Sequence, residues 1–121
     1  MSRGDAGSDG DDVPRIYVRS LGETASALVE YVEHGIEEEG VPWVVESGFD
    51  GDCVAIAHEA AVESPLKIGV CVSDTRLVVH HKQLAADAPV FDVTDPATAS
   101  ARHLGSNAAR LAKGTPLRPV E

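Results

Sequence analysis

The stretch HGIEEEGVPWVVES, residues 34–47, contains the transition that decides the fold. Its first half ends a helical pattern, because Gly40 is suited to stop a helix in the left-handed conformation and Pro42 cannot continue one. The second half, PWVVES (42–47), has the β-branched character of a strand. A helix that is followed at once by a strand is typical of α/β proteins.

Helical and strand patterns alternate outward from this point in the order β-α-β-α-β-β-β-α. Upstream, a short β-branched run predicts a strand at 14–20, and an amphipathic helix follows from Glu23 to about Glu39 with its apolar stripe facing the sheet. We therefore predict a small three-layer α/β sandwich with a mostly parallel sheet and flanking helices. The other predicted elements are a helix at 51–64 capped by Asp52, strands at 65–73, 75–84 and 89–94, and a last helix at 96–113 that Asp95 and Pro96 start.

The length of 121 residues is enough for one domain with a real core and too short for two. Residues 1–13 are mostly Gly, Ser and Asp, so we expect a disordered acidic tail there. A single α/β domain then occupies 14–121. Since aromatic residues make up only 4% of the chain, its core must consist mainly of Val, Ala, Leu and Ile.

The charge balance excludes some classes of partner. Ten basic and twenty acidic residues give a formal net charge of −10, which argues against a nucleic acid or an anionic membrane as partner. No apolar run approaches ~18 residues, and the N-terminus lacks a basic-then-apolar signal. We therefore expect a cytoplasmic protein.

No pattern of catalytic residues is visible. The motifs GxGxxG, GxxxxGK[ST] and GxSxG are missing. Cys53 and Cys71 lack the CxxC spacing of a zinc site, and we expect two buried reduced thiols. His80 and His81 follow each other on a predicted strand, so they point to opposite faces and cannot chelate one metal together. We expect a non-catalytic chain.

The segment SNAARLAKG (106–114) has two interpretations. A helix that starts at Ser106 and Asn107 would present free N–H groups to an anion, with Arg110 and Lys113 nearby. A capped amphipathic helix with solvated basic residues is the simpler interpretation, and we favour it.

The three glutamates at 37–39 stand at the carbonyl end of the first predicted helix, where each exposed anion costs about 0.3–1 kcal/mol. In a projection at 100° per residue, Glu30, Glu33 and Glu37 lie on the solvent side. A cation that bridges to a second chain would offset the unfavourable position. From the residues alone, a solvated helix end is the simpler interpretation and such a contact is the alternative.

A second row of residues on this helix consists of Ala27, Tyr31, His34 and Glu38. Gly35 lies between this row and the apolar stripe, and it exposes backbone for close approach. A tyrosine and a glycine on an outer flank favour a contact surface. One carboxylate makes a poor site for Mg²⁺ or Ca²⁺, so further ligands would have to come from another chain. The candidate partner interface is therefore Tyr31, His34, Gly35 and Glu38, with Glu38 as the candidate metal ligand.

Several blocks together resemble one known family, the small subunits of diol/glycerol dehydratase-reactivating factors of the propanediol-utilisation type. The resemblance covers about residues 15–118 and departs in the acidic tail, at His81 in place of an aromatic residue, and at Leu117 in place of Phe. The blocks are GIEEEGVPW (35–43), SPLKIGVCVSDTRLVVHHKQL (64–84), APVF (88–91) and GSNAARLAKGTPLR (105–118).

The resemblance implies a chaperone-like complex of a large ATPase subunit, which binds ADP or ATP, and a small subunit similar in fold to the dehydratase medium subunit. Such a complex releases damaged cobalamin from an adenosylcobalamin-dependent dehydratase, by exchange of the small subunit for the medium subunit. The resemblance also implies that the middle glutamate of GIEEEG, here Glu38, reaches an Mg²⁺ or Ca²⁺ ion held mainly by the large subunit. Glu37 and Glu39 would then contribute mainly to the local electrostatic field.

Other interpretations stay open. The chain resembles a dehydratase medium subunit or a fragment of one, and a stand-alone α/β enzyme or a self-assembling non-catalytic α/β protein are further alternatives. The sequence does not distinguish a diol from a glycerol dehydratase as client. It also leaves open a homo-oligomer in the absence of the partner, an association with a protein-shelled microcompartment, and a saline habitat as the origin of the acidity.

Overall fold

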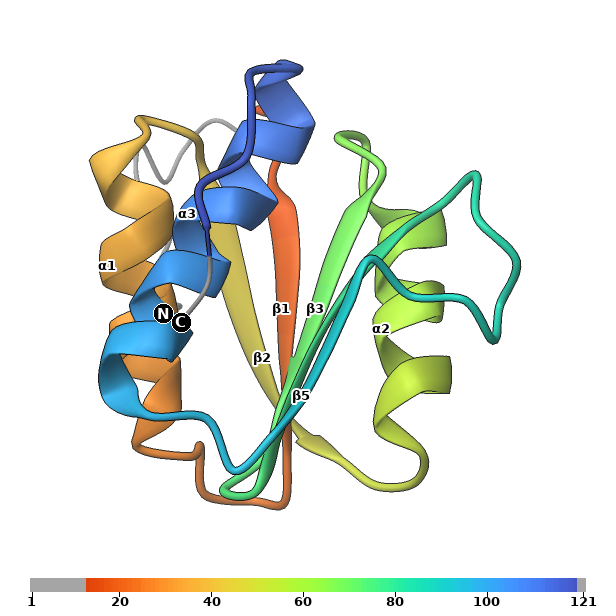
Figure 1. The fold of residues 1–121 in the computed structure, drawn as a ribbon. Coiled ribbons are helices and arrows are strands. Elements are labelled where there is room, and N and C mark those ends of the chain that lie inside the picture. Colours follow the sequence, from red (N-terminus) through yellow and green to blue (C-terminus); the bar gives the residue numbers. More distant parts are fainter. Residues whose placement is uncertain (1–12, 120–121) are drawn as a thin grey trace.

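The computed structural model describes residues 13–119, and a five-stranded sheet forms its middle layer. Helices α1 (Leu28–Glu38) and α3 (Thr98–Lys113) cover one face of this sheet, whereas α2 (Cys53–Glu63) covers the other (Figure 1). The predicted three-layer α/β sandwich is thus confirmed.

The strands lie in the order β2-β1-β3-β4-β5. β1 pairs in parallel with both β2 and β3, and β4 is antiparallel to both β3 and β5. The sheet is therefore mixed: four strands point the same way, and β4 runs against them because a short turn joins it to β3. The strands are β1 (Ile16–Leu21), β2 (Trp43–Phe49), β3 (Ile68–Val72), β4 (Arg76–His81) and β5 (Phe91–Thr94).

The core is mainly aliphatic, as the low aromatic content predicts. Its larger part lies between the sheet and the α1–α3 pair, and a smaller part that includes Cys53 and Cys71 lies under α2. Both cysteines are buried free thiols, as expected. β3 is buried along its whole length, which agrees with its continuous apolar sequence.

Helix α2 packs directly on the backbone of β3 at Gly69. A Cβ atom at this position would lie 2.3 Å from both the Ala57 carbonyl oxygen and the Ala61 nitrogen. Asp52 caps the helix, and its carboxylate accepts a hydrogen bond of 2.9 Å from the Ala55 N–H. The predicted cap of α2 is therefore confirmed.

The starts of the other two helices differ from the prediction. α1 begins at Leu28 and not near Glu23, because the Ser26 hydroxyl accepts a hydrogen bond from the Leu28 N–H and the loop before it is not helical. α3 begins at Thr98, after Ala97, and not at Pro96. Asp95 is not the predicted cap, since its backbone has a φ of 49° and its N–H donates to the Thr75 carbonyl oxygen at 2.7 Å.

Most of the predicted disordered tail, residues 1–12, lies outside the described part of the chain. Within residues 13–119 no helix combines the length and the apolar character that crossing a bilayer requires.

Candidate functional site

Helices α1 and α3 cross at very short range because each has a glycine at the contact. A Cβ atom on Gly35 would lie 2.0 Å from the Arg102 carbonyl oxygen, and one on Gly105 would lie 2.2 Å from the Val32 carbonyl oxygen. These are backbone atoms, which cannot move aside as a flexible side chain can. The first and last of the blocks that define the resemblance therefore lie against each other in the fold.

Glu39 connects the two helices by charge. Its carboxylate, only 12% exposed, accepts hydrogen bonds from Ser106 Oγ at 2.8 Å and from Arg110 Nε and Lys113 Nζ at 3.0 Å each. These donors, the Ser106 hydroxyl first, lower the pKa of Glu39 to about 2. Lys113 also donates to the Glu39 backbone carbonyl oxygen at 3.0 Å, which satisfies one acceptor at the end of α1.

Glu38, one residue earlier, has a different environment. Its side chain is 32% exposed, and its two carboxylate oxygens face the guanidinium groups of Arg102 on α3 and Arg118 in the C-terminal segment. Arg102 donates a hydrogen bond to Glu38 Oε2, and Arg118 Nη1 lies 3.9 Å from Oε1. Adjacent glutamates thus differ: Glu39 is enclosed, whereas Glu38 is accessible.

The other glutamates of α1 follow the projection only in part. Glu30 and Glu37 are exposed, as predicted. Glu33 is not on the solvent side: it is buried, and its Oε2 accepts a hydrogen bond of 3.0 Å from the Trp43 indole nitrogen. The projection missed this because the partner, Trp43, belongs to β2, and a burial that depends on a different element leaves no trace in the helical period.

The structure brings two of the predicted interface residues together. Tyr31 is 36% exposed, and its ring meets that of His34 edge-on, with 6.3 Å between the centroids. Gly35 does not belong to this exposed surface, and its prediction as a partner contact is wrong in its physical basis. The close backbone approach that it permits is to α3 of the same chain.

The segment 106–114 is not the start of a helix, and its partly exposed basic residues, Arg110 and Lys113, are bound to Glu39. α3 continues without a break through Ser106 and Asn107, both of which are buried. Asn107 binds the C-terminal segment: its Nδ2 donates to the Arg118 carbonyl oxygen at 2.8 Å, and its Oδ1 accepts from the Arg118 N–H at 2.6 Å. Arg110 donates to the Pro116 carbonyl oxygen at 3.0 Å. The polar residues of this block therefore assemble the α1–α3 surface.

Arg102 and Arg118 are the residues that sequence reasoning missed. Neither lies near Glu38 in the chain, so no spacing argument reaches them. A usable signal existed for Arg102, because an arginine one turn before Gly105 faces whatever helix packs on that glycine.

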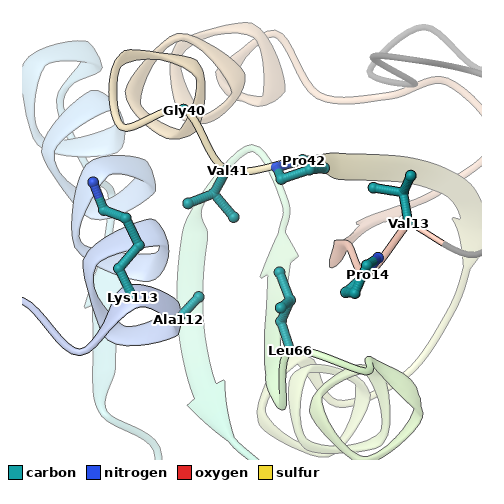
Figure 2. Close-up of a pocket in the computed structure, with 8 residues that line it drawn as sticks. All are labelled: Val13, Pro14, Gly40, Val41, Pro42, Leu66, Ala112 and Lys113. Carbon is teal, nitrogen blue, oxygen red and sulfur yellow. The ribbon is translucent and has the colours of Figure 1, made fainter. Parts of the chain in front are cut away.

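A pocket of about 290 Å³ lies where the carboxyl ends of α1 and α3 meet the starts of β1 and β3 (Figure 2). Its lining is mainly apolar, and three of the resembling blocks contribute to it. The lining residues are Val13, Pro14, Gly40, Val41, Pro42, Leu66, Ala112 and Lys113. Since its one charged group, Lys113, is bound to Glu39, the pocket holds no convergent set of groups for acid–base chemistry.

The two histidines of β4 have different environments. His80 is fully buried, with its Nε2 3.1 Å from the Ala86 carbonyl oxygen and its ring 4.7 Å from that of His58, whereas His81 is partly exposed. Within residues 13–119 no three His, Cys, Asp or Glu side chains are grouped so that they could hold a metal ion. Glu38 can therefore offer an oxygen ligand to a hard cation, but within residues 13–119 its neighbours do not complete a site.

Comparison with known proteins places the chain in a family. The family model "Dehydratase medium subunit" matches residues 13–118. The propanediol dehydratase-reactivating factor small subunit of Salmonella typhimurium is 42% identical over 108 residues, which are 88% of this chain and 92% of that protein. The diol dehydratase-reactivating factor small subunit of Klebsiella michiganensis is 45% identical over 87 residues, 71% of this chain and 70% of that protein.

Solved structures agree with this assignment. A diol dehydratase-reactivating factor complexed with ADP and Mg²⁺ contains a chain that matches with a TM-score of 0.82 at 38% identity, covering 88% of this chain and 99% of its own. A glycerol dehydratase reactivase matches with a TM-score of 0.81 at 31% identity, covering 88% and 97%. The relatives carry the name of the reactivating factor and not that of the dehydratase itself. The chain therefore belongs to the dehydratase medium subunit family and, within it, to the small subunits of the dehydratase-reactivating factors.

Proposed function

We propose that this small subunit pairs with a large ATPase subunit, and that the complex releases damaged cobalamin from an adenosylcobalamin-dependent diol or glycerol dehydratase. The release follows when the small subunit leaves the large subunit and the dehydratase medium subunit takes its place. The shared family of medium subunits and this chain supports such an exchange, because similar folds offer similar surfaces. The chain itself is non-catalytic in this scheme, and ADP or ATP is bound by the large subunit.

The observation that carries the proposal is the contrast between Glu38 and Glu39. Glu39 is held inside the chain by three donors, whereas Glu38 is accessible on the helical flank that also carries Tyr31 and His34. Of these two glutamates Glu38 is thus the one that can reach a partner, and in this proposal the interface comprises Tyr31, His34 and Glu38.

Glu38 supplies one oxygen ligand to an Mg²⁺ or Ca²⁺ ion whose other ligands belong to the large subunit. A carboxylate oxygen is a preferred ligand of both ions. The solved reactivating factor with ADP and Mg²⁺ supports the presence of a divalent ion in such a complex. A single metal–carboxylate bond adds specificity to an interface that still has to dissociate during the exchange.

The location follows from this function. We place the chain in the cytoplasm, where the client dehydratase is synthesised, with association with a protein-shelled microcompartment as a further possibility for the same complex.

The test is co-purification of the full chain with the large subunit of a dehydratase-reactivating factor, with Mg²⁺ and with a chelator. We expect a complex that the chelator weakens and that Glu38→Ala weakens to the same extent. Arg76→Gln is the surface control, since Arg76 binds Asp92 on β5, the edge strand opposite β2.

A complex that ignores both chelator and Glu38→Ala would retain the subunit assignment and exclude Glu38 as a metal ligand. Failure to bind the large subunit, together with a closed homo-oligomer in sedimentation, would instead favour self-assembly through the Tyr31–His34 surface.

A further inference from the structure

Glu38 already has a cationic partner within its own chain. Arg102 donates to one carboxylate oxygen, and Arg118 lies 3.9 Å from the other. A divalent ion from another subunit would need one of these two oxygens, and each of them already faces an arginine. Both arrangements satisfy the charge of Glu38, so they compete.

The two arginines can release Glu38 without a change of the fold. The side chains of Arg102 and Arg118 are 54% and 39% exposed, so each guanidinium can turn to water. The backbone of Arg118 stays fixed, because both its N–H and its carbonyl oxygen are bound by Asn107. The backbone of Arg102 stays fixed as well, since its carbonyl oxygen lies in the contact with Gly35.

The adjacent Glu39 shows what a permanent arrangement looks like. Its carboxylate is enclosed and has three donors, one of which is an uncharged hydroxyl. Exposed ion pairs such as Arg102–Glu38 add little to stability, because water competes for both charges. The charge of Glu39 is therefore held in an enclosed site, whereas the charge of the preceding residue, Glu38, is held by exposed arginines.

We propose that Arg102, assisted by Arg118, is an internal counter-ion that occupies Glu38 in the free small subunit and is displaced when the divalent ion of the partner arrives. This inference rests on the proposed function, because it takes Glu38 as the metal ligand. In this role Arg102 sets how much divalent ion the assembly needs. It pairs with the charge of Glu38 when the small subunit is alone.

The experiment is an Mg²⁺ titration of binding between the full chain and the immobilised large subunit, recorded by biolayer interferometry. Arg102→Gln removes the counter-ion, so we expect half-maximal binding at about two- to five-fold lower Mg²⁺, the range that an exposed ion pair allows. Arg102→Lys keeps the positive charge and should titrate close to the wild type. Arg76→Gln changes the net charge equally at a distant site and should not shift the curve.

All variants meet the same large subunit, so any effect of Mg²⁺ on its bound nucleotide cancels in the ratio. Circular dichroism and a thermal scan establish that each variant is folded. An Arg102→Gln curve that coincides with the wild type, or that moves to higher Mg²⁺ because Arg102 contacts the partner directly, overturns the inference.

Glu38→Gln separates this inference from the proposed function. If Glu38→Gln abolishes the Mg²⁺ dependence while Arg102→Gln changes nothing, the metal bridge stands and the counter-ion role is wrong. If Glu38→Gln binds with an unchanged Mg²⁺ dependence, Glu38 is not the ligand and both proposals fail.

Discussion

The layer of α2 and the layer of α1 and α3 both approach a neighbouring backbone closely, but their charged contacts differ. Both come close to a neighbouring backbone over a glycine, α2 over Gly69 of β3 and α1 over Gly35 and Gly105 at α3. Beneath α2 the contact is completed by small and apolar side chains such as Ala57 and Ile56, and by the buried Arg19, which donates to Glu63 of α2 at 2.6 Å. Between α1 and α3 the apolar core is joined by the largely enclosed carboxylate of Glu39 and its donors. Each layer thus combines apolar packing with a charged contact, but the charged contact of the α1–α3 layer lies next to the accessible Glu38.

The largest effect on stability should come from removing the glycine contact between α1 and α3. Gly35→Ala places a Cβ atom 2.0 Å from a backbone oxygen, so α1 and α3 must separate. We expect a loss of about 3 kcal/mol in the free energy of unfolding, measured by urea titration. Gly69→Ala, at 2.3 Å from two backbone atoms of α2, should cost a similar amount, because sterics act alike in both layers.

Gly40→Ala is the matched control for these substitutions. Gly40 has a φ of 73° but no atom within 4 Å of the added Cβ, so only backbone strain remains and the loss should be about 1 kcal/mol. A loss for Gly35→Ala no greater than that for Gly40→Ala would contradict the proposed close crossing.

Glu39→Gln removes the charge that binds α3 to the end of α1. The substitution leaves Arg110 and Lys113 without their carboxylate, and we expect a loss of about 2 kcal/mol in urea titration. Asp52→Ala, which removes only the cap of α2, should cost about 1 kcal/mol. Equal losses would mean that the charge on Glu39 adds nothing beyond an ordinary helix cap.

The pH dependence sharpens the same comparison. The pKa of Glu39 in the folded chain is about 2, below the ordinary value of 4.5, so the unfolded chain binds this proton more readily than the folded one. The stabilisation is complete above the ordinary value and is lost as the pH falls from 4.5 towards 2. When the pH is lowered from about 6 to about 3, the melting temperature of Glu39→Gln should fall less than that of the wild type. Parallel curves would show that Glu39 is not the group responsible.

The smallest effect on stability should come from Glu38→Gln. Its pair with Arg102 is exposed on both sides, so the free energy of unfolding should change by less than about 1 kcal/mol. Substitution of Glu39 would then lower mainly the stability of the chain, whereas substitution of Glu38 would weaken mainly its assembly with the large subunit. Urea titration and a binding assay on the same protein preparation measure both quantities, and a large loss of stability for Glu38→Gln would remove the distinction.

Much of the fold could be predicted because it depends on local patterns. The switch from a helical to a strand pattern around Gly40 and Pro42, the continuous apolar run of β3 and the cap at Asp52 all lie within a few residues of each other. Such signals place elements along a chain and indicate which of them are buried. They place boundaries less well: the first helix starts later than its period indicates, at Leu28, whose N–H donates to the Ser26 hydroxyl.

The sequence by itself determined the layered α/β order, the two buried thiols, the family resemblance and the importance of the three glutamates. Tertiary structure alone decided which groups each glutamate binds. Glu33 is bound by Trp43, Glu39 by three donors of α3, and Glu38 by two arginines that lie far away in the chain. The reason is physical: a local pattern encodes which face of a helix is apolar, whereas the environment of a carboxylate depends on which distant donors the packing brings within hydrogen-bonding distance.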